Sequence, residues 1–308
     1  MILRLAKAMA WTRPLKPYPG WHFGVDEEPE LKGKVKFRLA IWDYFNRYRL
    51  QRPIIMDWYN GSRTYVYIGN DISRCLFVGG CIDPNEFAFL DRVIDPGMVF
   101  IDVGANDGLY TLFAAPRVGT VLAIEPSSRE FERLRANIEL NRLRNVIALQ
   151  VALSDLPGEG TLCVGGYEHE GQNTLGEFSY VGVELGYKEK VELKRLDDLV
   201  DQAGLKNVDI IKLDLEGAEF SVLRGAMRTM TVFRPLLLLE LSDVALKRQG
   251  STAGEVVSLL QSLGYEIYTF DETSGKPVKA VDYSKLSHNI VAAHPVRNWV
   301  GLNDFING

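Results

Sequence analysis

The stretch Val99-Phe-Ile-Asp-Val-Gly-Ala-Asn-Asp-Gly-Leu-Tyr110 decides the fold of this chain. Its apolar start, residues 99–101, shows no polar alternation, which is typical of a strand buried on both faces of a parallel sheet. Gly104 and Gly108 follow, and glycines let a backbone turn tightly and approach a ligand closely. An apolar helix is expected from about Leu109 to Ala115. The stretch therefore predicts a strand, a tight turn and a helix, with a ligand over the end of the strand.

Asp102 lies near the carboxyl end of this predicted strand. The resulting spacing, Asp-x-Gly-x-x-x-Gly, differs from the dinucleotide fingerprint G-x-G-x-x-G, whose glycines let a pyrophosphate rest on a helix N-terminus. A leading acid repels a phosphate, but it accepts a hydrogen bond from a cationic or amino-bearing ligand. This points to S-adenosylmethionine. A turn that serves only tight packing is the alternative, and the motif alone does not decide between the two.

From Val99 onward, strands and helices alternate, which implies a parallel sheet with right-handed crossovers. The predicted fold class is α/β: a Rossmann-like, seven-stranded sheet over residues 96–308, preceded by a smaller α+β lobe over residues 1–95. The last two strands, residues 265–270 and 289–293, are expected to form the antiparallel edge of the sheet, with a turn at residues 271–277 between them. A Gly-rich insertion, residues 156–190, is expected to form a flap or hairpin. The other predicted strands are residues 121–124, 145–151, 208–213 and 236–239, and the predicted helices are residues 128–141, 196–199, a segment ending near Met230, and 254–263.

The N-terminal lobe is predicted to combine helices with a hairpin. Residues 54–68 alternate around Asn60-Gly61, a pair typical of a type I′ turn, and residues 72–78 are expected to add a third strand. Residues 1–11 are expected to form a short amphipathic helix that docks on the protein rather than on a membrane. A helix is expected over residues 31–51, with one side formed by Phe37, Ile41, Tyr44 and Phe45.

Another helix is expected to begin at Pro84, just before the main strand. Asp83 precedes it as the expected N-cap, and proline is favoured at the first helical position. Glu86 is placed to complete a capping box.

An acid also follows the second predicted strand. Glu125 comes about 20 residues after Asp102, where an acid can accept hydrogen bonds from both hydroxyls of a ribose. The alternative is an acid near a helix N-terminus, a placement worth about 0.3–1 kcal/mol. With Asp102 upstream, the ribose role is favoured. Ser154 and Asp155 leave the third strand at the same edge of the sheet and are expected to border an adenine ring.

Lys212 and Asp214 lie at the end of the fourth predicted strand. Because side chains in a strand alternate with a period of two, both point to one side of the sheet. A lysine inside a buried strand is costly unless it is paired. The two residues are therefore either a base and an acid at the ligand site or a purely structural pair.

Composition narrows the class of protein. The chain has 308 residues, 46% of them hydrophobic, and a net charge of −5, which argues against a dedicated nucleic-acid partner. Cys75, Cys81 and Cys163 have no spacing typical of zinc sites or disulfide frameworks, which favours a cytoplasmic location. No apolar run reaches transmembrane length, so stable membrane insertion is not expected. The sequence leaves a homo-oligomer open.

One set of motifs spans residues 86–240, about half of the chain. In this arrangement the sequence resembles the FkbM family of S-adenosylmethionine-dependent methyltransferases. The most specific part is the Lys-x-Asp-x-Glu-Gly-Ala-Glu block. The motifs are Glu86, PGMVFIDVGANDG at 96–108, Glu125-Pro126, ALSD at 152–155, IKLDLEGAE at 211–219, LRGA at 223–226, and Arg234-Pro235 through Glu240.

The resemblance implies a Rossmann-like methyltransferase domain, S-adenosylmethionine as methyl donor, and a hydroxyl acceptor on a sugar, a glycan or a polyketide-like natural product. It implies that Asp214 closes the donor pocket near the methyl group, that Glu125 binds the ribose, and that Ser154 or Asp155 borders the adenine. For Glu86, capping of its helix explains the residue equally well. The residues implied to bind the donor are Glu86, Asp102, Gly104, Ala105, Asn106, Gly108, Glu125, Pro126, Ser154, Asp155 and Asp214.

Methyl transfer to an alcohol needs in-line approach and removal of the hydroxyl proton. The candidate bases or orienting groups are Asp214, Glu240 and His288, with Lys212 as an electrostatic helper. Catechol-type methyltransferases hold Mg²⁺ with acids after the fourth and fifth strands, but residues 240–243 depart from that pattern, so no metal is expected. Two other functions stay open. One is RNA 2′-O-methylation, whose Lys-Asp-Lys-Glu arrangement is partly matched by Lys212, Asp214 and Glu240. The other is a non-catalytic nucleoside-binding module.

Overall fold

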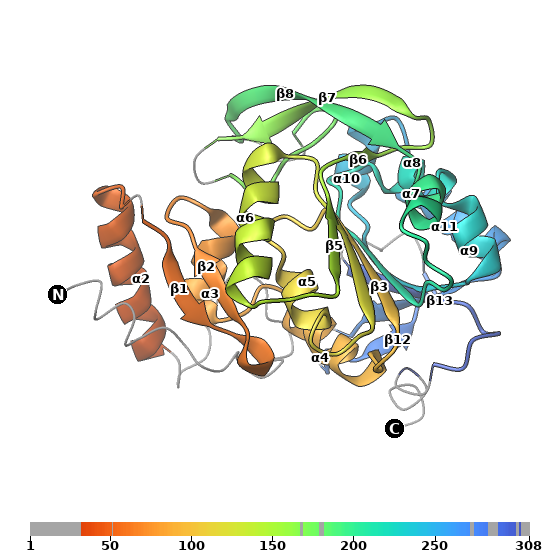
Figure 1. Ribbon diagram of the computed structural model, residues 1–308, viewed down its shortest axis with the longest axis horizontal. Coiled ribbons are helices and arrows are strands. Elements are labelled where there is room, and N and C mark those ends of the chain that lie inside the picture. The colour runs from red at the N-terminus through yellow and green to blue at the C-terminus, as the bar shows by residue number, and fades with distance from the viewer. Residues whose placement is uncertain are drawn as a thin grey trace.

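The computed structural model describes residues 32–50, 52–166, 169–178, 182–271, 274–282, 289–299 and 302. Within these residues, a mixed eight-stranded sheet has the order β12-β11-β13-β10-β9-β3-β4-β5 (Figure 1). Strands β10, β9, β3, β4 and β5 are parallel, which confirms the α/β, Rossmann-like fold. The strands are β3 (Val99–Val103), β4 (Thr120–Ile124), β5 (Val146–Leu149), β9 (Ile210–Leu213), β10 (Leu236–Glu240), β11 (Glu266–Phe270), β12 (Pro277–Lys279) and β13 (Asn289–Ala293).

The antiparallel edge contains one strand more than predicted. β13 and β11 are antiparallel to their neighbours, as expected. Beyond them, β12 begins at the end of the predicted turn and pairs with β11, with Tyr268 opposite Lys279. A three-residue strand that begins with proline is too short to show any hydrophobic alternation, so the pattern does not reveal it.

Helices cover both faces of the sheet, which explains the unbroken apolar runs in its central strands (Figure 1). Successive strand residues point to opposite faces. Phe100 belongs to a hydrophobic cluster with residues of α4, α5 and α6, whereas Ile101 belongs to a second cluster with residues of α7, α8, α9 and α11. The helix predicted to run to Met230 is split near Gly225, where a side chain would overlap the backbone of Ser154. The helices are α4 (Pro84–Val93), α5 (Leu109–Ala114), α6 (Ser128–Leu140), α7 (Leu196–Gln202), α8 (Glu219–Arg224), α9 (Met227–Val232), α10 (Asp243–Arg248) and α11 (Ala253–Ser262).

The predicted hairpin of the N-terminal lobe is confirmed. Strands β1 (Ile54–Asp57) and β2 (Arg63–Val66) pair antiparallel. The connection contains the short 3₁₀ turn η2 (Tyr59–Gly61), and Asn60 and Gly61 have φ angles of 53° and 75°. Both central residues therefore adopt the positive φ that the Asn-Gly pair indicated. Buried residues of the lobe belong to the same hydrophobic cluster as Phe100 of the central sheet, and the boundary at residue 95 stays a prediction.

The third strand predicted for residues 72–78 is wrong, because these residues form helix α3 (Asp71–Gly79). The Asn70 side chain accepts a hydrogen bond from the Ser73 N–H at 2.6 Å, which caps the start of the helix. Gly80, with a φ of 84°, ends it in the left-handed region. A short apolar run has no periodicity that distinguishes a strand from a helix. The capping residues at its two ends therefore determine that it forms a helix.

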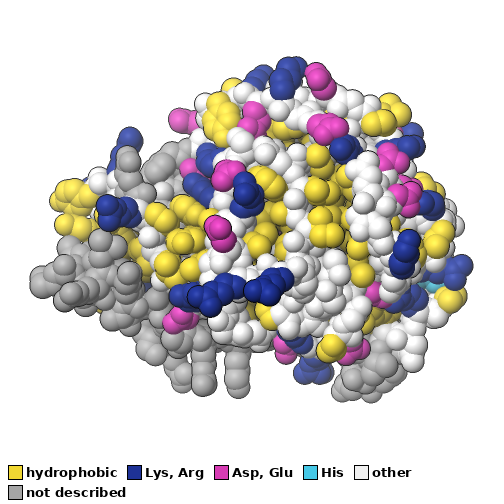
Figure 2. Space-filling model, in the orientation of Figure 1, with side chains coloured by type: hydrophobic (Ala, Val, Ile, Leu, Met, Phe, Trp, Pro, Cys, Tyr) yellow, Lys and Arg dark blue, Asp and Glu magenta, His cyan; other side chains and the backbone are white. Residues whose placement is uncertain are grey.

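The helix predicted over residues 31–51 is present as α2 (Lys32–Arg47). On its predicted hydrophobic side Phe45 is buried, but Phe37 and Tyr44 are 47% and 44% exposed, and Arg38 and Trp42 are buried instead. The Arg38 guanidinium donates to the Phe77 carbonyl at 3.0 Å, so a charged residue lies on the buried side of α2. A hydrophobic pattern does not anticipate such a residue. Figure 2 shows exposed hydrophobic side chains at the left edge of this face, over α2.

The predicted insertion forms a three-stranded sheet, shown at the top of Figure 1. Its strands are β6 (Ala152–Leu153), β7 (Gly158–Gly165) and β8 (Leu185–Lys194), and β7 and β8 make the expected hairpin. We call residues 158–194 the flap. Among the helices of the described residues, none is long and apolar enough to cross a membrane. The helix predicted for residues 1–11 lies outside the described residues.

Candidate functional site

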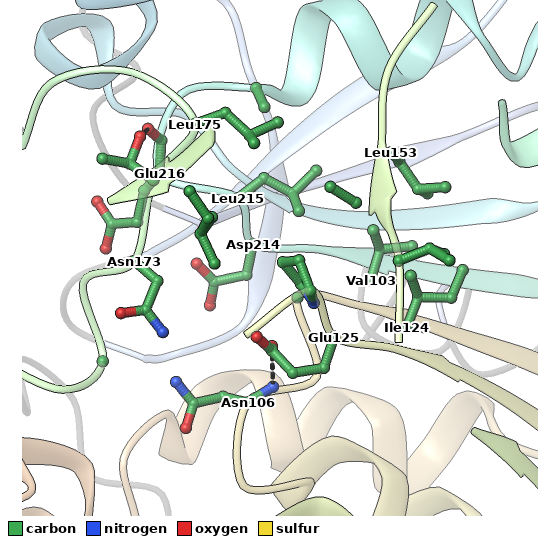
Figure 3. Close-up of a pocket in the computed structure, with 18 of the residues that line it drawn as sticks. Val103, Asn106, Ile124, Glu125, Leu153, Asn173, Leu175, Asp214, Leu215 and Glu216 are labelled. Atoms are coloured by element: carbon green, nitrogen blue, oxygen red, sulfur yellow. Dashed lines mark hydrogen bonds between the residues drawn. The ribbon is translucent and has the colours of Figure 1, made fainter. Parts of the chain in front are cut away.

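A pocket opens at the carboxyl ends of β3, β4 and β9 (Figure 3). This is the edge of a parallel α/β sheet where ligands bind in this fold class. Its wall combines apolar side chains of the strands with polar side chains at their ends. Five of the predicted site residues line it: Gly104, Asn106, Glu125, Pro126 and Asp214.

The glycine turn after β3 is held against two neighbouring strands. The N–H groups of Gly104 and Ala105 both donate to the Ile124 carbonyl of β4, each at 3.0 Å. Gly104 has a φ of 74°, and a side chain there would overlap the backbone carbonyl oxygen of Asp214. The turn therefore brings β3 and β9 closer than any residue with a Cβ permits. Gly108, with a φ of 90°, precedes α5 at its N-cap.

Glu125 is buried at the end of β4 and holds the turn in place. One carboxylate oxygen accepts from the Asn106 N–H at 2.8 Å, and the other accepts from the Ser127 N–H at 2.9 Å (Figure 3). Burial, followed by repulsion from Glu130, raises the pKa of Glu125 to about 8. Each oxygen keeps a lone pair, because a carboxylate oxygen accepts more than one hydrogen bond. The group is therefore oriented to accept from a pair of hydroxyls in the pocket.

Lys212 and Asp214 point to the same side of the sheet, as predicted. The Lys212 Nζ lies 2.8 Å from Asp214 Oδ2, and the side chains are 2% and 43% exposed, respectively. In the sheet, Lys212 is level with Asp102 of β3. Burial alone would lower the pKa of Lys212, but attraction from Asp214, Asp83 and Asp102 outweighs it and raises the pKa. A buried ammonium thus supports a carboxylate that faces the pocket.

Two acids precede the main strand, and neither makes the predicted capping box. Asp83 is the N-cap of α4 but makes no capping hydrogen bond with its side chain. Instead, it accepts from the Tyr110 hydroxyl at 2.7 Å. Glu86 accepts from the Asn289 amide at 2.9 Å, and burial, followed by repulsion from Asp83, raises its pKa to about 8. Tertiary contacts with α5 and β13 therefore replace the local cap.

The other predicted residues lie around the pocket rather than in its wall. Asp102 is buried and accepts from the Thr111 hydroxyl at 2.6 Å. Ser154 and Asp155 contact the Ser221 hydroxyl at 3.2 Å and 3.0 Å. Burial, followed by repulsion from Asp214 and Glu216, raises the pKa of Glu240 to about 9. Their roles stay predictions, and His288 lies outside the described residues.

Sequence reasoning missed the flap side of the pocket. Asn173, Thr174 and Leu175 line it, and Figure 3 shows Asn173 facing the same space as Asp214 and Asn106. The Gln249 amide fixes this segment by donating to Thr174 Oγ1 at 3.1 Å and to the Glu216 carbonyl at 3.0 Å. The flap was predicted as a hairpin, but no motif in it marks a binding residue.

With this geometry in place, comparison with known proteins identifies the family. The model described as the Methyltransferase FkbM domain matches residues 102–267, which is more than half of the chain. The chain belongs to the FkbM methyltransferase family. The match begins at Asp102 and includes the glycine turn, Glu125 and the Lys212–Asp214 pair.

Curated relatives are similar to about half of the chain. "2-O-methyltransferase NoeI" of Sinorhizobium fredii is 31% identical over 183 residues, which cover 54% of the chain and 72% of the relative. "31-O-demethyl-FK506 methyltransferase FkbM" of Streptomyces tacrolimicus is 30% identical over 200 residues, 56% of the chain and 74% of the relative. "Methyltransferase 1" of Beauveria bassiana is 28% identical over 174 residues, 50% of the chain. The chain spans 66% of that relative's length.

Proposed function

We propose that this FkbM-family chain binds S-adenosylmethionine in the pocket and transfers its methyl group to a hydroxyl. The observation that carries the proposal is the convergence of Glu125 and Asp214, from two strand ends, on one cavity that the glycine turn opens (Figure 3). The cavity suits a nucleoside, because it joins hydroxyl acceptors to an apolar wall that includes Val103 and Leu153. It also suits a cation, because Asp214 faces it with a carboxylate.

The residues fit the donor group by group. Glu125 is the ribose ligand, since its two oxygens are fixed by backbone N–H groups and keep lone pairs toward the pocket. Asp214 attracts the positively charged methionine part. When bound, S-adenosylmethionine supplies the activated methyl group, and the chain positions the acceptor for in-line attack.

The acceptor is proposed to be a hydroxyl of a sugar, a glycan or a polyketide-like natural product. The names of two relatives, a 2-O-methyltransferase and a 31-O-demethyl-FK506 methyltransferase, support oxygen as the methylated atom. Asp214 and Glu240 are the candidate bases for the hydroxyl proton. With a pKa near 9, Glu240 is largely protonated at pH 7, whereas Asp214 is paired with a cation and faces the pocket. This contrast favours Asp214 as the base.

A radiolabelled transfer screen tests the proposal. The full chain is incubated with methyl-labelled S-adenosylmethionine and pools of glycans, natural-product alcohols and RNA, and the labelled species are identified by mass spectrometry. Label on an alcohol of the first two pools is expected. Transfer to RNA alone would replace this function by RNA 2′-O-methylation. Donor binding without transfer to any pool would favour a non-catalytic module.

Glu125→Gln is expected to weaken binding of S-adenosylmethionine by about 10–100-fold, because an NH₂ group cannot accept a hydrogen bond and a buried polar group left without a partner costs about 1–3 kcal/mol. The amide keeps one acceptor but sets an NH₂ group against the N–H of Asn106 or Ser127. Titration calorimetry measures the affinity. Glu189→Gln is the matched control, since Glu189 also accepts from a backbone N–H, that of Ser128, outside the pocket. Equal affinity losses in both variants would contradict the ribose role.

Methyl transfer is expected to survive EDTA. Among the described residues, no group of three or more His, Cys, Asp or Glu side chains is placed to hold a metal ion. Asp214 is paired with the Lys212 ammonium instead. The measurement is the transfer rate after treatment with EDTA, with and without added Mg²⁺. Loss of activity that Mg²⁺ restores would show that a metal takes part.

A further inference from the structure

The Lys212 ammonium has a second anchor besides Asp214. Its Nζ lies 4.6 Å from the centre of the Tyr110 ring, over the face of the aromatic system. Such a cation–π contact is strongest where water is excluded, and Lys212 is almost fully buried. Tyr110 belongs to α5, the helix that begins directly after the glycine turn. The ammonium is therefore held between the end of β9 and the first turn of α5.

Tyr110 is in turn fixed by the N-terminal lobe. Its hydroxyl donates to Asp83 Oδ2 at 2.7 Å, and its ring stacks on Phe87 of α4 with the ring centres 4.6 Å apart. Asp83 immediately precedes α4, so the lobe contributes a carboxylate beside the end of the central sheet. The family match begins only at Asp102 and does not include Asp83.

We propose that Asp83 and Tyr110 are positioning residues, which hold the Lys212 ammonium charged and directed at Asp214. Asp83 contributes negative charge near the ammonium, and Tyr110 contributes both the aromatic face under it and the hydroxyl that fixes Asp83. The inference rests on the proposed function, in which Asp214 acts on the ligands. It extends the methyl-transfer machinery into the N-terminal lobe.

The charges around Lys212 determine the direction in which its pKa is expected to change in the variants. Besides Asp214, the carboxyls that interact with Lys212 are those of Asp83, Glu86, Asp102, Glu216 and Glu240. Burial raises the pKa of each of these carboxyls, and attraction to the Lys212 ammonium opposes that rise. Removal of one negative charge makes the ammonium less favourable and lowers the pKa of Lys212. The Tyr110 hydroxyl favours ionised Asp83, so its removal acts in the same direction, but less strongly.

The test is a direct titration of the Lys212 side chain in the full chain, by NMR of protein labelled with ¹³C at lysine Cε. The Lys212 signal is assigned by its loss in Lys212→Arg. In Asp83→Asn the midpoint is expected to fall by about one pH unit or more, the size of shift that a neighbouring opposite charge causes. In Tyr110→Phe a smaller fall is expected. Tyr265→Phe is the matched control, because the buried Tyr265 hydroxyl bonds to the Met230 carbonyl away from the pocket.

An unchanged midpoint in folded Asp83→Asn would overturn the proposal. If Asp83→Asn does not fold, an unchanged midpoint in Tyr110→Phe would overturn it instead. Calorimetry with S-adenosylmethionine on the wild-type chain separates this outcome from failure of the proposed function. If the wild type binds the donor while the midpoint stays fixed, only the positioning role fails. If the wild type does not bind, the proposed function fails, and the link to methyl transfer fails with it.

Discussion

Gly104→Ala is expected to lower the free energy of unfolding by about 4 kcal/mol or to prevent folding altogether, a loss reached by few single substitutions. Two causes act together. The residue has a φ of 74°, where a Cβ is unfavourable, and the new methyl group would overlap the Asp214 carbonyl oxygen. That oxygen is backbone, so it cannot rotate away. Relief requires β3 and β9 to separate at the pocket, and donor binding is therefore expected to be lost as well.

Gly61→Ala is the matched control for the backbone angle. Gly61 has a φ of 75°, almost identical to that of Gly104, but a Cβ there would meet no atom within 4 Å. Its expected cost is therefore only that of the left-handed conformation, about 1–2 kcal/mol. Urea unfolding followed by circular dichroism measures both variants. Equal losses would show that the close approach to Asp214 does not contribute.

Features set by neighbouring residues in the sequence were predictable. Residues 99–110 predicted β3, the turn and α5, because a buried strand, glycines and an apolar helix are local signals. The common side of Lys212 and Asp214 follows from strand geometry alone, and their 2.8 Å contact agrees with it. Hydrophobic periodicity did not predict burial or secondary structure correctly where tertiary contacts or helix caps determine them. Arg38 is buried because the Phe77 carbonyl accepts its hydrogen bond. Residues 72–78 form a helix rather than the expected strand, because the Asn70 side chain caps its start.

The site divides in the same way. The position of Glu125 was predictable, because its distance from Asp102 along the chain places it at the end of the next strand. The partners of Asp83 and Glu86 were not, since Tyr110 and Asn289 reach them only when α5 and β13 pack beside α4. Asn173 lies in a loop whose path depends on contacts such as that of Gln249 with Thr174. No spacing rule connects those positions.

Lys212→Met is expected to reduce the rate of methyl transfer by about 10²–10³-fold, because Asp214 loses the ammonium that positions it, and a positioned general base contributes about 10²–10⁴-fold to the rate. Without the ammonium, Asp102 and Asp83 lose the cation that stabilises their ionised forms, and Asp214 loses its partner at 2.8 Å. The remaining acids then repel one another and take up protons. Asp214 is then no longer oriented by the ammonium for removal of the acceptor's proton, so turnover is expected to fall more than donor affinity.

Single-turnover rates and calorimetric donor affinities, measured on the same preparation, separate this effect from misfolding. Lys279→Met is the control for loss of a lysine ion pair, since Lys279 and Glu266 lie 2.6 Å apart but are 57% and 37% exposed. Its expected effect on the rate is negligible, because exposed pairs contribute about 0–1 kcal/mol. The double variant Lys212→Met with Asp214→Asn is expected to lose less activation free energy than the sum of the losses in the two single variants, because the two residues act as one unit. Rate and affinity falling together with the circular dichroism signal would instead make Lys212 a purely structural residue.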